Sequence, residues 1–192
     1  MGKGRIEAFS DGVIAIIITI MVLELKVPHG AKLADLTVLW PVFLSYVLSF
    51  TNVGIYWNNH HHLFHAAKKV TGGVLWANLH LMFWLSLMPF TTAWAGENHF
   101  ETMTIVVYAL DLMMCAVAYI ILQQTLVAAN GGAESTMARA LGGDLKGKIS
   151  LAAYVIAVPA AFMSTALASA LIVIVALIWL IPDRRIEKAL SE

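Results

Sequence analysis

Apolar residues follow one another in long blocks along this chain, and short polar stretches separate the blocks. Most blocks approach the roughly 20 residues that a helix needs to cross a bilayer. The last block, 149–181, is too long for one span without strong tilt, and Pro159 with the small residues 164–169 marks the place to divide it. We therefore predict six transmembrane helices over about 5–27, 38–64, 74–94, 103–129, 149–164 and 167–182. One kinked long helix in place of the last two is the alternative.

The composition also predicts an all-α membrane protein, with one domain over residues 1–192. Hydrophobic residues make up 60% of the chain, charged residues 12%, and the mean hydropathy is +0.79, which is more apolar than a soluble core requires. The formal net charge is zero, so no basic face points to nucleic acid. The single cysteine, Cys115, lies in an apolar run, where neither a disulfide nor a metal cluster is expected.

The basic residues predict the orientation, because short cytoplasmic loops retain Lys and Arg. Six spans with a cytoplasmic N-terminus place ten basic residues inside, namely Lys3, Arg5, Lys68, Lys69, Arg139, Lys146, Lys148, Arg184, Arg185 and Lys188. Only Lys26 and Lys32 then lie outside. A single span over 149–181 would move the last three basic residues outside and weaken this bias. We therefore expect six spans with both termini in the cytoplasm.

Polar side chains enter the first predicted helix at membrane depth. Arg5, Glu7, Ser10 and Asp11 all precede its apolar part, and an unpaired charge there costs about 3 kcal/mol. Arg5 and Asp11 are nearly two turns apart, so partners on other helices are expected. The candidates are Asn58, Asn59, His60, His61, His62, Asn78 and His80. The simpler interpretation is that Ser10 caps the helix and Asp11 complements its dipole.

The histidines also raise the question of a metal site. His61 and His65 are spaced i, i+4, as in zinc-binding helices. The sequence has no HExxH motif, however, and no Cys or Glu ligands lie nearby. Histidines that pack or form hydrogen bonds are commoner, so we expect no bound metal and no cofactor. Protonation of the cluster would give sensitivity to pH.

The apolar part of the first helix carries a stripe on one face. At about 100° per residue, Ile16, Ile20 and Leu23 align, with Thr19 at the edge of the stripe and Asp11 on another side. Packing against lipid or against the protein core is the ordinary explanation of such a stripe. Periodicity alone favours that explanation.

A short motif adds a resemblance to a known family. Arg5, Phe9, Ser10 and Asp11 match the RxxxFSD signature that opens the first helix of the transmembrane protein 175 family, which comprises lysosomal potassium-permeable channels and their bacterial and archaeal relatives. The chain is also similar to single-repeat prokaryotic members in length. Further matching segments are Tyr56-Trp57 with the following Asn and His residues, Asn78, and Pro89-Phe90-Thr91-Thr92.

This resemblance implies a homotetramer in which four copies of the first helix line a central pore. Carried over by position, Ile16, Ile20 and Leu23 form the apolar layers of the pore, Ile16 is the narrowest layer, and Thr19 is the polar ring beside it. No TVGYG filter sequence is present. The resemblance further implies a network that anchors the first helix, made of Arg5, Phe9, Ser10, Asp11, Trp57, His60, His61, His62 and Asn78.

The predicted function is a potassium-permeable cation channel with a hydrophobic constriction and modest selectivity over sodium. Potassium is the permeant ion, the channel lies in the plasma membrane of a prokaryote, and no enzymatic activity is expected. The main competing function is a proton-coupled transporter that uses Asp11, Glu24 and the histidines as a relay. Two more functions stay open at this point, a membrane enzyme with a metal at 60–65 and a passive structural subunit.

Overall fold

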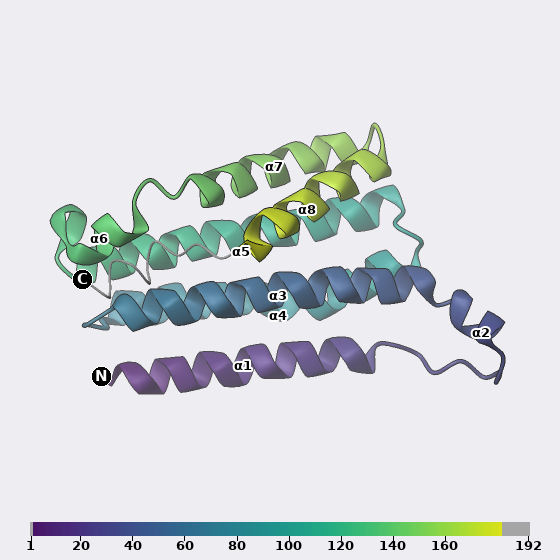
Figure 1. Cartoon of the computed structure of the whole chain (residues 1–192), viewed down its shortest axis with the longest axis horizontal. Coiled ribbons are helices and arrows are strands. Elements are labelled where there is room, and N and C mark those ends of the chain that lie inside the picture. Colours follow the sequence, from purple (N-terminus) through teal and green to yellow (C-terminus); the bar gives the residue numbers. More distant parts are fainter. Residues whose placement is uncertain (1, 182–192) are drawn as a thin grey trace.

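The computed structural model describes residues 2–181. Six main helices run back and forth along one axis of this part of the chain (Figure 1). They are α1 (Lys3–Leu23), α3 (Trp40–Ala66), α4 (Gly72–Glu97), α5 (Thr102–Ala129), α7 (Leu145–Ala161) and α8 (Thr165–Leu180). Three short elements connect them, α2 (Leu33–Thr37), η1 (Gly132–Glu134) and α6 (Thr136–Leu141). We refer to the two ends of the bundle as the α2 end and the α6 end.

Several helix boundaries differ from those expected, because the local sequence at each end sets them. α1 stops at Leu23, four residues before the predicted end, where the charged Glu24 and Lys26 follow. Val27 then precedes Pro28, and the residue before a proline is disfavoured in a helix. α7 begins four residues earlier than predicted, because the Asp144 carboxylate accepts a hydrogen bond from the Gly147 amide. α7 continues through Pro159, and the turn lies at 162–164. The short helices α2 and α6 are not predicted from the sequence.

The turn between α7 and α8 follows from a second cap. The Ser164 hydroxyl accepts a hydrogen bond from the Leu167 amide and starts α8 at Thr165. Residue 182 of the predicted last helix lies outside the described residues, as do the basic residues Arg184, Arg185 and Lys188.

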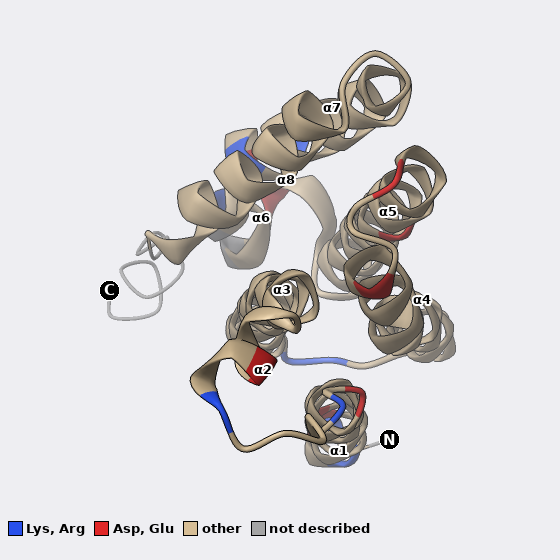
Figure 2. Ribbon diagram, turned by 90° about the vertical axis from the view of Figure 1, so that its right-hand side faces the viewer, with Lys and Arg blue, Asp and Glu red and all other residues tan. Residues whose placement is uncertain are grey.

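The helices form a central set and two outer groups. α3, α4 and α5 lie in the middle, α1 packs on α3 and α4 at one side, and α7 with α8 packs on α5 and α3 at the other (Figure 2). Large apolar side chains fill the space between these helices and are fully buried, among them Phe64, Leu81, Leu85, Leu112 and Leu122. α1 is thus an outlying helix that rests on two others.

A single amide holds the turn between α3 and α4 at the α6 end. Asn130 follows the last residue of α5, and its Oδ1 accepts hydrogen bonds from the amides of Lys68 at 2.7 Å and Lys69 at 2.8 Å. Its Nδ2 donates to the carbonyl oxygens of Lys69 and Leu126. The side chain therefore fixes both helices of the α3–α4 pair relative to α5.

At the α2 end, α3 and α4 approach closely at a glycine. A Cβ atom on Gly96 would lie 2.8 Å from the Cα atom of Val42 and would also overlap the Ser45 hydroxyl. Any side chain there would push the helices apart, because the contact is with backbone that has no rotamer to change. Gly96 therefore permits the close contact of the two helices.

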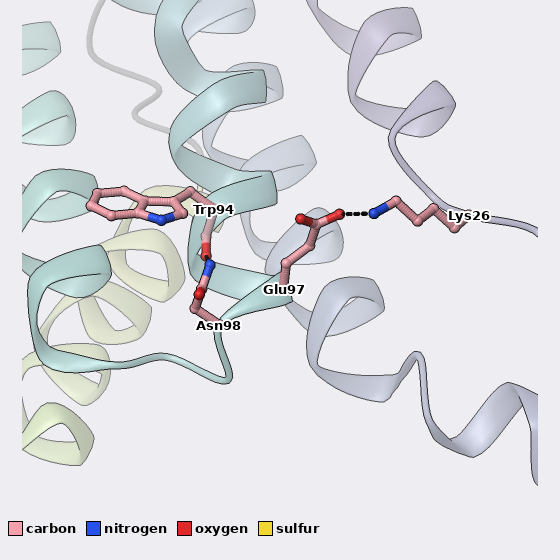
Figure 3. Close-up of polar contacts among 4 residues, drawn as sticks. All are labelled: Lys26, Trp94, Glu97 and Asn98. Carbon is pink, nitrogen blue, oxygen red and sulfur yellow. Dashed lines mark hydrogen bonds and ion pairs between the residues drawn. The ribbon is translucent and has the colours of Figure 1, made fainter.

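An ion pair beside this contact ties the end of α1 to the bundle. Lys26, in the linker after α1, pairs with Glu97 at the end of α4 (Figure 3). The hydrogen bond from Lys26 to Glu97 raises the pKa of Lys26, so the ammonium stays charged at every physiological pH. In the same turn, the Asn98 side chain donates to the Trp94 carbonyl oxygen at 2.8 Å. The pair is exposed, so it adds a tether rather than much stability.

Length and hydropathy identify the candidate membrane spans. α1, α4 and α5 are long and apolar enough to cross a bilayer, and α8 is apolar but has 16 residues. At about 1.5 Å per residue, α8 is about 24 Å long, shorter than a hydrocarbon core of about 30 Å. α3 has 27 residues, but polar Asn and His side chains occupy its last part. This polar part fits an α3 whose α6 end reaches the membrane interface.

Candidate functional site

The two faces of α1 have different surroundings. The face toward α3 and α4 is buried and consists of Ile6, Ser10, Ile14, Ile17 and Met21. The opposite face is open, with Ile16 58%, Ile20 40% and Leu23 78% exposed, and Thr19 is exposed between them. The predicted pore residues therefore all lie on the face of α1 that the chain itself leaves uncovered.

Thr19 has a defined orientation on this open face. Its hydroxyl donates a hydrogen bond to the Ile16 carbonyl oxygen at 2.8 Å. Because a hydroxyl has one proton and two lone pairs, the oxygen of Thr19 keeps acceptor capacity directed away from the helix axis. Such an oxygen can accept from water or interact with a cation.

A buried chain of hydrogen bonds joins α1 to α4 and α3. The Asn78 amide nitrogen on α4 donates to the Ser10 hydroxyl at 2.9 Å, and the Asn78 carbonyl oxygen lies 2.8 Å from Nε2 of His60 on α3. Since that oxygen only accepts, Nε2 of His60 carries the proton. The three side chains are at most 1% exposed. We call Ser10, Asn78 and His60 the polar junction.

Asp11 makes a second contact one residue further along α1. Its carboxylate accepts a hydrogen bond from the Trp57 indole nitrogen at 3.0 Å. Both residues are exposed at the edge of the α1–α3 contact, with Trp57 46% exposed. The carboxylate therefore has a donor on α3, which lowers the cost of placing it in a membrane helix.

The remaining residues of the predicted network lie outside these contacts. Arg5 and Phe9 line a hollow of about 280 Å³ between the start of α1 and α4, whose wall includes Asn78. His61 is exposed, and its ring stacks on Trp57 at 6.3 Å between centroids. The His62 ring lies edge-on to it at 5.7 Å. The structure thus brings together five of the nine predicted residues by hydrogen bonds and leaves four beside them.

The geometry of the histidines bears on the metal hypothesis. His61 and His65 are stacked, with ring centroids 6.1 Å apart and an interplanar angle of 20°. Within residues 2–181, no group of three His, Cys, Asp or Glu side chains is placed to hold a metal ion. Stacked rings do not converge their nitrogens on a common point as zinc requires.

A second buried polar cluster joins α3, α4 and α5 and is not predicted from the sequence. The Ser49 hydroxyl lies 2.8 Å from the Tyr108 hydroxyl and accepts from Thr92 at 2.6 Å, and Asn52 donates to Tyr108. The signal that would have found it is the spacing of Ser45, Ser49 and Asn52, which places three polar side chains on one face of α3.

Beside this cluster lies a buried carboxyl group. Asp111 on α5 is 4% exposed and accepts a hydrogen bond from the Thr91 hydroxyl at 2.9 Å. Its other oxygen has no hydrogen-bond partner among the described residues. An unpaired buried oxygen is costly, so Asp111 is the least satisfied polar group of the described bundle.

Substitution of Asn78 tests how much the polar junction contributes to the stability of the folded protein. Asn78→Ala leaves two buried groups, on Ser10 and His60, without their partner, and each unsatisfied group costs about 1–3 kcal/mol. We expect a lower midpoint of thermal unfolding in detergent. Ser86→Ala is the matched control, because that hydroxyl is exposed on α4 and bonds only to its own helix. Equal midpoints for the two variants would contradict the proposed contribution of the polar junction to stability.

Comparison with known proteins gives consistent matches. The family model for the endosomal/lysosomal potassium channel TMEM175 matches residues 5–89. A potassium channel of Chryseobacterium sp. (strain P1-3) is 53% identical over 192 residues, the full length of both chains. The human endosomal/lysosomal proton channel TMEM175 is 40% identical over 83 residues, which are 37% of this chain and 16% of that protein.

A solved structure is similar over nearly the whole fold. The crystal structure of a lysosomal potassium-selective channel TMEM175 homolog from Chamaesiphon minutus has a TM-score of 0.81 and 27% identity, and the match covers 92% of this chain and 95% of that chain. The predicted all-α membrane fold with about six main helices is thereby confirmed. The matches point to a channel family and not to an enzyme. This multi-pass membrane protein belongs to the TMEM175 family.

Proposed function

We propose that the chain forms a homotetrameric cation channel in which four α1 helices surround the pore and potassium is the preferred ion. One observation carries the proposal. The open face of α1 holds Ile16, Thr19, Ile20 and Leu23, while the opposite face is fixed by the polar junction. A six-helix subunit is too slender to enclose a pore alone, whereas a symmetric ring creates one on its axis.

The residues on the open face suit a hydrophobic constriction. A ring of Ile16 side chains excludes water when narrow, so dewetting closes the pore, and Ile20 and Leu23 extend the apolar lining toward the α2 end. Among monovalent cations, potassium gives up water more readily than sodium. Four Thr19 oxygens replace part of the lost hydration. The expected result is modest selectivity without a carbonyl filter.

The polar junction, Asp11 and Trp57 serve in this proposal as the anchor of α1. They set its rotation, so that the apolar stripe faces the axis, and they are not ion ligands. The anchor is flanked at the α6 end by Arg5, Phe9, His61 and His62. The α6 end lies in the cytoplasm of a prokaryotic cell, the channel lies in the plasma membrane, and no cofactor is required.

Protons are the competing permeant ion. The human relative is named a proton channel, and the histidines and Asp11 supply titratable groups near α1. Against a relay across the membrane, the hydrogen bonds of the polar junction link three helices at one level and end at Ser10. A proton-coupled transporter requires such a relay to continue along the membrane normal.

The reversal potential tests the proposal directly. Purified protein in a planar bilayer, with potassium chloride on one side and sodium chloride on the other, should give a current that reverses near the potassium equilibrium potential. A second recording with symmetrical potassium chloride and a pH gradient should reverse close to zero. Reversal at the proton equilibrium potential would favour proton conduction, and slow saturable flux without unitary currents would favour a carrier.

Ile16→Asn tests the position of the constriction. A polar side chain wets the narrow layer, so the conductance or the open probability should rise severalfold in the same bilayers. Val22→Asn is the matched control, because Val22 is also exposed, at 44%, but lies about 120° away around α1. Equal currents in the two variants would place the narrowest layer elsewhere.

Thr19→Val tests the source of selectivity, because valine keeps the shape of the side chain and removes its oxygen. Loss of about 1 kcal/mol in the relative stabilisation of potassium lowers the potassium-to-sodium permeability ratio about fivefold. The measurement is the reversal potential under the bi-ionic conditions above. Thr51→Val on α3 is the control, since its hydroxyl also bonds to its own helix. An unchanged permeability ratio in Thr19→Val would remove Thr19 from the selectivity mechanism.

A further inference from the structure

A long cavity separates α8 from α3 on the side of the bundle opposite α1. It has a volume of about 570 Å³, and its walls come from α3, α4, α5 and α8 together with His99 and Phe100 in the α4–α5 linker. On α8 the lining residues recur from Thr165 to Leu180 at intervals of three or four positions. They thus form one face of the helix over about 22 Å, which is more than the depth of one leaflet, about 15 Å.

The lining of the cavity calls for an apolar occupant. Most wall residues are aliphatic, and four of the six hydroxyl groups on the walls are hydrogen-bonded within the protein. Ser45 donates to the Val42 carbonyl oxygen, Thr51 to the Val47 carbonyl oxygen, and Thr92 to the Ser49 hydroxyl. Water would find few free partners there, and a polar ligand would leave its own groups unpaired.

The dimensions argue against a helix of a second copy as the occupant. A helix with side chains is at least about 10 Å across, so 22 Å of it fills about 1,700 Å³. The cavity offers about 1,370 Å³ even when the space on its open side is included. Leu44, Val173 and Leu177 are 45%, 39% and 56% exposed at its edges, so the cavity is open along the side of the bundle.

The two ends of the cavity differ in polarity. At the α2 end, His99 and Thr165 stand at its mouth, and His99 is exposed in the linker. At the other extreme, the lining consists of the aliphatic side chains of Leu177 and Leu180. A polar mouth at the interface and an apolar slot along the membrane normal are complementary to an amphiphile whose headgroup lies at the α2 end.

We propose that this cavity is a binding site for one phospholipid, with one of its two acyl chains between α3 and α8 and its headgroup beside His99 and Thr165. The lipid fills the space that would otherwise separate the α7–α8 pair from α3. It is held between helices on three sides, so it exchanges more slowly than lipid around the rest of the bundle. The site is remote from α1, and its occupancy does not depend on ion conduction.

Retention of lipid through purification tests the site. The full-length protein is washed in detergent without added lipid, and organic phosphorus is measured per chain. Val173→Trp places a large ring in the cavity and should lower the retained phospholipid severalfold relative to wild type. Ile174→Trp is the matched control, because Ile174 is 51% exposed on the same helix but does not line the cavity. Equal retention in both variants, or no retained phospholipid in wild type, would overturn the proposal.

Photochemical crosslinking identifies the occupant independently. A benzophenone amino acid at position 173 should give, on irradiation of the washed protein, a monomer whose mass has increased by that of a phospholipid. The same amino acid at position 174 should give severalfold less of this product. A covalent dimer formed from position 173 would assign the cavity to an interface between copies of the chain, and equal phospholipid adducts at both positions would indicate surrounding lipid only. Either result would refute the specific site.

Discussion

The hydrogen bonds of Asn78 determine how the first helix is placed, and the open face of α1 depends on them. A predominantly apolar helix in a bilayer has little preference for one rotation over another, since lipid and neighbouring helices are equally apolar. Asn78 donates to Ser10 and accepts from His60, and these two bonds select one rotation, because each is buried and has no substitute partner in hydrocarbon. One amide on α4 therefore fixes which residues of α1 remain uncovered.

The same constraint explains why polar residues in this bundle gather at separate levels. The polar junction serves α1, while the cluster around Ser49 and Tyr108 joins α3 to α5 and α4. Between the clusters the contacts are aliphatic and less specific. α3 and α4 contribute to both clusters, so these two helices form the frame to which the outer helices are attached.

The sequence was sufficient for the main helices and for much of the polar junction, for physical reasons. Apolar blocks of spanning length have few other conformations open to them in a membrane, and polar side chains at one depth must find one another. It was insufficient to select among His60, His61 and His62, because consecutive residues point about 100° apart and only packing shows that His60 faces Asn78. The Tyr108 cluster was missed because Thr92 and Tyr108, which bind the polar face of α3, are isolated polar residues on two other helices. The helix ends were shifted in part by caps such as Asp144.

Asn130 holds the turn between α3 and α4 and thereby fixes the position of these two helices relative to each other. Its amide contacts the chain just after α3 and just before α4, so any sliding of one helix past the other must first break bonds of 2.7–3.1 Å. A slip of one residue is about 1.5 Å, enough to separate His60 from Asn78. Asn130 thus keeps α3 and α4 in register, although it lies in neither helix. The rotation of α1 therefore depends on Asn130 at the end of α5. The hydrogen bonds of Asn130 hold α3 and α4 in register, and the polar junction then orients α1 on them.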